Sequence, residues 1–285
     1  MKISIAILTK NAGHHIELLL TRLREQRISC PLEIVAVDSG SRDNTLPALR
    51  AAGAVVSEIP PRAFSFGPAR QKAFEMSSGD VVVTMSQDVI PIGRDFLSQL
   101  INPIASGAAD VVQGKTMVSP ASDTFYWHRD SRLFYFTREA EDYVLANGSV
   151  KLSCECLAIT RKAWESTGFG DAPYCEDKRI QVRLHRQGFR ILKILDPIAY
   201  HDHRFTFVQL MKRCHNEGVG WRSASALYST RRFVSDLVLA PFRFRRELIE
   251  AVLVGRLRTP AELLFFQVRP ICVFIGNRFS RQLWW

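Results

Sequence analysis

The chain has 285 residues, of which 47% are hydrophobic and 23% are charged, and its formal net charge is +10. This composition is ordinary for a globular protein with room for one sizeable domain and an appendage. Six scattered cysteines with no Cys-x-x-Cys pair exclude a dense disulfide framework. The chain enters an apolar strand pattern at once, without a basic and apolar leader, so we expect reduced thiols in a cytoplasmic protein.

Apolar runs and helical patterns alternate along the first hundred residues. Strands are predicted over residues 2–8, 32–38, 54–59 and 80–86, and helices over 14–26, 43–53, 67–79 and 94–105. Strands that alternate with helices at this spacing are typical of a mainly parallel sheet with helices on both faces. The sequence therefore predicts an α/β fold.

Polar side chains follow three of these predicted strands, at the point where each strand ends. They are Thr9-Lys10-Asn11, Asp38-Ser39-Gly40-Ser41 and Gln87-Asp88. Ligands of parallel sheets bind beyond the carboxyl ends of the strands, so Asp88 lies where a ligand is expected. An aspartate near a strand end also commonly caps a turn, and both interpretations of Asp88 remain open here. Asp38 could accept a hydrogen bond from a nucleobase, and the Ser-Gly-Ser turn would let the backbone approach a ribose.

The usual phosphate-binding loops are missing from the sequence. No Gly-x-Gly-x-x-Gly follows the first strand, which continues instead into "TKNAGHH", and there is no P-loop. These absences exclude a dinucleotide-binding fold and a P-loop nucleotidase.

Three segments, in order and spacing, resemble the N-terminal half of family 2 glycosyltransferases with the GT-A fold. They are "ILTKNAG", "IVAVDSGSRDNTL" and "FSFGPARQKAFEMSSGDVVVTMSQDVIP", and they look most like the bacterial rhamnosyltransferase-type branch. The stretch that runs from "CECLAITRKAW" to "YCEDKRIQVRL" resembles that family's acceptor half, and "YHDHRFTFVQL" resembles its tail block. The resemblance covers about residues 2–222. It implies a GT-A domain over 1–222, with a nucleotide-sugar half (1–115) and an acceptor half (116–222), followed by an extension over 223–285.

The resemblance implies an inverting transferase that moves a sugar from a nucleoside-diphosphate donor to a glycan or lipid-linked acceptor, in bacterial surface polysaccharide synthesis. The family usually has Asp-x-Asp where this chain has Ser86-Gln87-Asp88, so Asp88 would be the sole carboxylate from this loop to hold Mg²⁺ or Mn²⁺. His201 and His203 would add metal contacts, and the alternative for this pair is a solvated strand end. A non-catalytic sugar-nucleotide-binding or scaffold relative is the competing hypothesis.

The resemblance also assigns the acceptor base. It makes Asp177 the group that deprotonates the acceptor hydroxyl, with Glu176 as runner-up, although acids in a first helical turn are also favoured by the helix dipole. Arg70 falls where the family contacts the donor, but Gln71 replaces the usual asparagine. The expected nucleotide-sugar site consists of Thr9, Asn11, Asp38, Ser39, Ser41, Arg70, Gln87 and Asp88.

The C-terminal extension is basic and amphipathic. Residues 231–285 contain ten arginines and four acidic residues, interleaved with apolar side chains. Nucleic acid, an anionic membrane or merely a solvated helix face would fit this pattern. The terminal Trp284 and Trp285 favour a membrane surface over nucleic acid, and no apolar run reaches the roughly 20 residues that span a bilayer. We therefore expect a helical extension that contacts the inner face of the cell membrane and binds no nucleic acid.

Overall fold

The computed structural model describes residues 1–120, 122, 138–148, 150–202, 205–255, 257 and 259–279. Contacts divide the chain into two compact units. The first contains Met1–Ser119 and Asn147–Asp202, and the second contains Pro120–Ala146 and His203–Trp285. The division at residue 222 stays a prediction, and helix α8 (Phe207–Ser223) belongs to the second unit together with the C-terminal extension.

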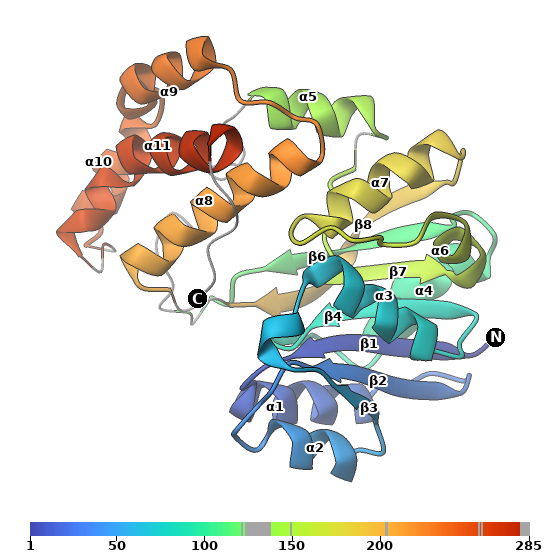
Figure 1. Cartoon of the computed structure of the whole chain (residues 1–285). Coiled ribbons are helices and arrows are strands. Elements are labelled where there is room, and N and C mark those ends of the chain that lie inside the picture. The colour runs from blue at the N-terminus through green and yellow to red at the C-terminus, as the bar shows by residue number, and fades with distance from the viewer. Residues whose placement is uncertain are drawn as a thin grey trace. The chain divides into compact units, whose positions relative to one another are not determined.

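An eight-stranded sheet forms the first unit (Figure 1). Its strands in chain order are β1 (Ile3–Thr9), β2 (Leu32–Asp38), β3 (Val55–Glu58), β4 (Val81–Ser86), β5 (Val89–Pro91), β6 (Val111–Met117), β7 (Cys156–Thr160) and β8 (Ile191–His201). The order across the sheet is β3-β2-β1-β4-β7-β6-β8-β5. The predicted parallel arrangement holds from β3 to β4 and again between β6 and β8, whereas β7 pairs antiparallel with β4 and β6, and β5 pairs antiparallel with β8.

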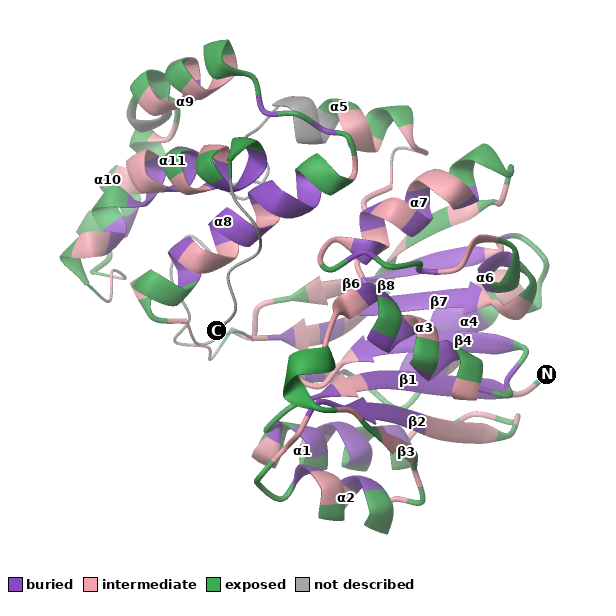
Figure 2. Cartoon of the chain, in the orientation of Figure 1, coloured by how far each residue is buried: buried purple, intermediate pink, exposed green. Residues whose placement is uncertain are grey.

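Helices cover both faces of this sheet, as predicted. They are α1 (Gly13–Arg24), α2 (Thr45–Ala51), α3 (Phe66–Met76), α4 (Phe96–Ala105), α6 (Arg161–Thr167) and α7 (Glu176–Arg186). The alternation of side chains along β1 shows how the faces divide. Ile3, Ile5 and Ile7 pack with α1, α2 and α4, whereas Ala6 belongs to the apolar cluster of α3, α6 and α7. The strands of the sheet's centre are accordingly buried on both sides (Figure 2).

The second unit is helical in the residues that the structure describes. It contains α5 (Arg138–Ala146), α8, α9 (Thr230–Arg243), α10 (Arg245–Leu253), the short 3₁₀ helix Pro260–Leu264 and α11 (Phe265–Arg278). The predicted C-terminal helices are therefore present. Within the described part of the chain, no helix combines the length and the apolar character that crossing a bilayer requires.

Helices α8 and α11 pack closely through glycine. A Cβ atom on Gly218 would overlap the Val273 carbonyl group, and one on Gly276 would overlap the His215 carbonyl group. Asn277 on α11 stabilises this contact, because its Nδ2 donates a hydrogen bond to the Gly218 carbonyl oxygen at 3.0 Å. Much of the extension's apolar surface is thus packed against α8, in a cluster that includes Phe265 and Phe266.

Candidate active site

The ends of β1 and β2 form the first polar cluster. Thr9 and Asp38 are register partners in the parallel ladder. The Asp38 carboxylate is fully buried, and it accepts hydrogen bonds from Thr9 Oγ1 at 2.8 Å, from the Gly40 and Ser41 amides, and from Ser41 Oγ. The Ser39 amide and hydroxyl both donate to the Thr9 carbonyl oxygen. Asp38 therefore fixes the Ser-Gly-Ser turn that the sequence singled out.

Asn11 and Gln87 extend this cluster toward the neighbouring strand end. Asn11 has a φ of +46°, a conformation that costs an asparagine little but other residues more. Its amide donates to Ser41 Oγ, and its Oδ1 accepts from the Arg42 amide. Gln87 Oε1 accepts from the Lys10 amide at 2.8 Å, which ties the β4 end to the β1 end. The structure thus brings six of the predicted residues into one hydrogen-bonded edge, namely Thr9, Asn11, Asp38, Ser39, Ser41 and, through Lys10, Gln87.

Asp88 lies in a second cluster with His201. The β5–β8 register pairs Val89 with His201, so the residue before Val89 meets the last side chain of β8. Asp88 Oδ1 is 3.1 Å from His201 Nε2, and Glu155 Oε2 is 3.4 Å from His201 Nδ1. Burial lowers the pKa of His201, but the Glu155 and Asp88 carboxylates outweigh it and raise the pKa to about 10.

The Asp88–His201 pair fits a divalent cation. Neighbouring ligand atoms of an octahedral ion at roughly 2.1 Å lie about 3 Å apart, which is the separation of Asp88 Oδ1 and His201 Nε2. A carboxylate and an imidazole are both ligands that Mn²⁺ accepts. Among the described residues there is no group of three or more His, Cys, Asp or Glu side chains that could hold a metal. The predicted ligand His203 lies outside the described residues.

Arg70 and Glu176 form a buried ion pair. Arg70 Nε donates to Glu176 Oε1 at 3.0 Å, and the two side chains are 6% and 7% exposed. Arg70 also donates to Thr84 Oγ1 on β4. Burial raises the pKa of the Glu176 carboxyl, and Arg70 opposes that shift. Of the two candidate bases, Glu176 is thus the more deeply buried, and its carboxylate is paired with a buried guanidinium.

Asp177 is the more accessible of the two acids, with a side chain that is 18% exposed. It is the second residue of α7, whose N-cap residue Cys175 has a φ of +56°. Its Oδ1 accepts from the Lys178 amide at 2.8 Å, and its Oδ2 lies 3.1 Å from Lys178 Nζ. Lys178 Nζ also donates to the Leu152 carbonyl oxygen, so this buried lysine fixes the carboxylate.

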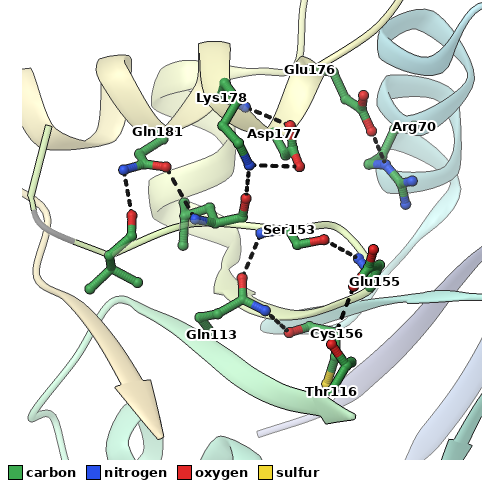
Figure 3. A network of polar contacts seen from close by, with 12 residues as sticks. Arg70, Gln113, Thr116, Ser153, Glu155, Cys156, Glu176, Asp177, Lys178 and Gln181 are labelled. Atoms are coloured by element: carbon green, nitrogen blue, oxygen red, sulfur yellow. Dashed lines mark hydrogen bonds and ion pairs between the residues drawn. The ribbon is translucent and has the colours of Figure 1, made fainter. Parts of the chain in front are cut away.

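One loop leads from the Asp177 site to Glu155, whose carboxylate contacts His201. Figure 3 shows the polar contacts that hold this loop. Lys178 and Gln181 on α7 bind the backbone at Leu152, while Gln113 on β6 accepts from the Ser153 amide at 2.6 Å. Glu155 follows two residues later and faces His201. Sequence reasoning missed Glu155, Lys178, Gln113 and Gln181. Glu155 carried the one weak signal, as an acid flanked by two cysteines in a strand-like stretch.

A mixed sheet covered on both faces, with acidic and histidine side chains at its strand ends, is the architecture of GT-A glycosyltransferases. Residues 4–168 match the family model for glycosyl transferase family 2. Since the match spans more than half of the chain, the chain belongs to that family, and it is a glycosyltransferase.

Individual relatives agree with this assignment. The chain is 24% identical over 229 residues to the O-antigen chain rhamnosyltransferase RfbN of Salmonella typhimurium, covering 77% of this chain and 72% of that protein. The fold resembles the mannosyltransferase PcManGT from Pyrobaculum calidifontis in complex with GDP-Man and Mn²⁺, with a TM-score of 0.66, 17% identity and coverage of 98% of this chain and 87% of that one. It also resembles glucosyl-3-phosphoglycerate synthase from Mycobacterium tuberculosis in complex with Mn²⁺, UDP and glucosyl-3-phosphoglycerate, with a TM-score of 0.59, 18% identity and coverage of 80% and 81%.

Proposed function

We propose that the protein is an inverting, metal-dependent transferase that moves a sugar from a nucleoside-diphosphate donor to a glycan or lipid-linked acceptor. The observation that carries the proposal is the pairing of two separate acidic sites on one sheet. Asp88 with His201 suits a cation beside a diphosphate, and the partly exposed Asp177 suits a base. Both sites lie in the first unit and are joined by the loop that ends at Glu155.

In this proposal the strand-end cluster of Thr9, Asn11, Asp38, Ser39, Ser41 and Gln87 holds the nucleoside. Asp38 acts by holding the Ser-Gly-Ser turn, whose backbone would approach the ribose. Arg70 has its guanidinium bound to Glu176 and Thr84, so its contribution is to fix α3 and α7 beside the donor.

Asp177 accepts the proton of the acceptor hydroxyl as that oxygen attacks the anomeric carbon. A new carbon–oxygen bond forms, the bond from that carbon to the diphosphate breaks, and a single displacement inverts the configuration. Lys178 holds the Asp177 carboxylate through Oδ2, which leaves Asp177 oriented before the acceptor arrives.

Asp88 and His201 would hold Mg²⁺ or Mn²⁺, and a bound cation would neutralise charge on the departing diphosphate. RfbN is named an O-antigen chain rhamnosyltransferase. By similarity to it, we propose that the product belongs to a bacterial surface polysaccharide.

Transfer assays with two variants test the assigned roles. Asp177→Asn should lower transfer by about 10²–10⁴-fold, because the amide cannot accept the proton, while nucleoside diphosphate binding persists. Asp88→Asn should instead raise the Mn²⁺ concentration that half-saturates activity, because one anionic ligand is lost. If the protein is instead a non-catalytic relative, the wild type should release no nucleoside diphosphate from any donor in a panel of sugar nucleotides, and neither should the variants. That result would reject the proposal.

We further propose that the extension contacts an anionic membrane at the inner face of the cell membrane. More than half of the exposed large apolar side chains of the described residues lie beyond residue 230. On α9 and α10 they form what we term the α9–α10 surface, which consists of Val234, Val238, Leu239, Phe242, Ile249, Val252 and Leu253. Arg231, Arg245 and Arg246 on the same helices are exposed as well. Exposed apolar side chains beside arginine suit an interface with anionic lipid.

Vesicle sedimentation with the full chain tests this surface. The wild type should bind vesicles that contain anionic lipid, more weakly as salt rises, and should bind neutral vesicles less. Phe242→Ser with Leu253→Ser should lose binding and keep nucleotide affinity, whereas the exposed control Leu195→Ser in the first unit should change neither. A different result would be that the wild type does not bind vesicles but sediments as a dimer, and that the double variant sediments as a monomer. The α9–α10 surface would then join two copies of the chain instead.

A further inference from the structure

Glu155 occupies a position that two strand registers create. It directly precedes β7, and its carbonyl oxygen accepts from the Ser86 amide at 3.1 Å, in the antiparallel ladder that pairs Met85 with Cys156. Glu155 therefore lies across from the strand end that leads to Asp88. His201 reaches the same place from β8 through its pairing with Val89. Residues far apart in the sequence are thus brought together at one point of the sheet.

The His201 ring is held between two carboxylates, one at each nitrogen. Nε2 is 3.1 Å from Asp88 Oδ1, and Nδ1 is 3.4 Å from Glu155 Oε2. The ring is only 5% exposed. Glu155 is itself held in place, because its Oε2 accepts from Thr116 Oγ1 at 3.2 Å and its amide donates to Ser153 Oγ at 3.3 Å. These contacts fix which ring nitrogen faces Asp88.

An imidazole binds a cation through one nitrogen while the other nitrogen carries the proton, and a carboxylate that accepts this proton's hydrogen bond fixes both the tautomer and the ring orientation. We infer that Glu155 is a positioning residue that accepts a hydrogen bond from His201 Nδ1 and so presents Nε2, beside Asp88, to the divalent cation. This inference rests on the proposed function, in which Asp88 and His201 hold the cation.

The geometry favours this role over that of a third ligand. Glu155 lies near Nδ1 of His201, whereas Asp88 lies near Nε2, so the two carboxylates contact different nitrogens of the ring. In the described part of the chain, the three side chains do not form a group that could surround one ion. Glu155 can therefore influence the cation through His201 without touching it.

Two measurements test the inference, neither of which uses activity. The first is the affinity for Mn²⁺ alone, from the electron paramagnetic resonance signal of the free ion. The second is long-range ¹H–¹⁵N correlation of the His201 ring with Mg²⁺ present, the signal being identified by its loss in His201→Gln. Glu155→Ala should weaken Mn²⁺ binding about 10–100-fold and abolish the protected Nδ1 proton. Glu155→Gln should lose less, because its amide oxygen can still accept from Nδ1.

Glu165→Ala is the matched control, because Glu165 is an exposed acid on α6 that pairs with Arg161. It should leave both readouts unchanged. Circular dichroism should show that the Glu155 variants are folded, and Glu155→Gln keeps the test valid if Glu155→Ala is not. Normal Mn²⁺ affinity and an unchanged Nδ1 proton in both Glu155 variants would overturn the inference alone. A wild type that binds no Mn²⁺, or an Asp88→Asn variant that binds it normally, would overturn the proposed cation site and this inference with it.

Discussion

The buried Arg70–Glu176 pair yields a prediction that separates structure from catalysis. Glu176→Gln keeps the shape of the side chain but removes the charge that faces Arg70. Because the two side chains are 6% and 7% exposed, water cannot replace the lost partner. Removing one member of a buried ion pair typically costs about 3–5 kcal/mol, since the other charge remains buried without compensation. The glutamine oxygen can still accept from Arg70 Nε, so we expect a loss near the lower limit, about 3 kcal/mol.

For a unit of this size, about 3 kcal/mol corresponds to a fall in melting temperature of roughly 6–12 °C. Urea unfolding gives the free energy directly, and calorimetry gives the temperature. Glu165→Gln breaks an exposed pair with Arg161, in which the Glu165 side chain is 57% exposed. That control should change stability by less than about 1 kcal/mol.

Transfer rates are then compared at a temperature where every variant is folded. We expect Asp177→Asn to lose far more transfer than Glu176→Gln, because Asp177 is the more accessible of the two acids. If Glu176→Gln is as stable as the wild type but inactive, Glu176 is the base and the reasoning from burial is wrong.

Three further predictions follow from other contacts. Asp38→Ala should weaken nucleoside diphosphate binding by about 1–3 kcal/mol in calorimetry, because the turn loses its four hydrogen bonds, and unchanged affinity would remove Asp38 from the site. Hydrogen bonds from Lys2, Ser4 and Ser78 outweigh burial and lower the pKa of Glu33 from 4.5 to about 2. The resulting stability is present above about pH 4.5 and is lost as the pH falls toward 2. Glu33→Gln should therefore reduce the change in the free energy of urea unfolding between pH 4.5 and pH 2 by about 1–2 kcal/mol, after allowance for solvent screening. An equal pH dependence of unfolding in the wild type and the variant would contradict this. A chain ending at Arg222 should expose the apolar side of α8 and aggregate or lose its helical signal in circular dichroism, whereas a soluble and fully helical fragment would show that α8 needs no α11.

The first four strands and their helices could be predicted because their signals are local. Within the run "DVVVTMS", Val81 to Met85 are buried in the structure, and the leucine stripe of α1 faces the sheet. The polar ends of β1, β2 and β4 meet because parallel strands share an edge. Each of these features depends on periodicity within about ten residues.

The antiparallel strands and the Glu155 contact could not be predicted in this way. Whether β7 runs antiparallel between β4 and β6 depends on pairing between residues 44 to 79 positions apart, which local patterns do not encode. The contact of Glu155 with His201 can be recognised only when the β4–β7 and β5–β8 registers are known. Lys178 likewise resembles any helix lysine until its Nζ is found on the Leu152 carbonyl oxygen. The metal-ligand and base roles given to Asp88 and Asp177 stay predictions.

The glycine contacts between α8 and α11 have a consequence for building chimeric enzymes. The backbones of the two helices approach each other closely at Gly218 on α8 and at Gly276 on α11, where a side chain would overlap the other helix. A chimera that takes only the last helices from a relative would place a foreign surface against Gly218, with no matching glycine guaranteed opposite His215. Segments exchanged between such enzymes should therefore begin before α8, so that both halves of the contact come from the same parent.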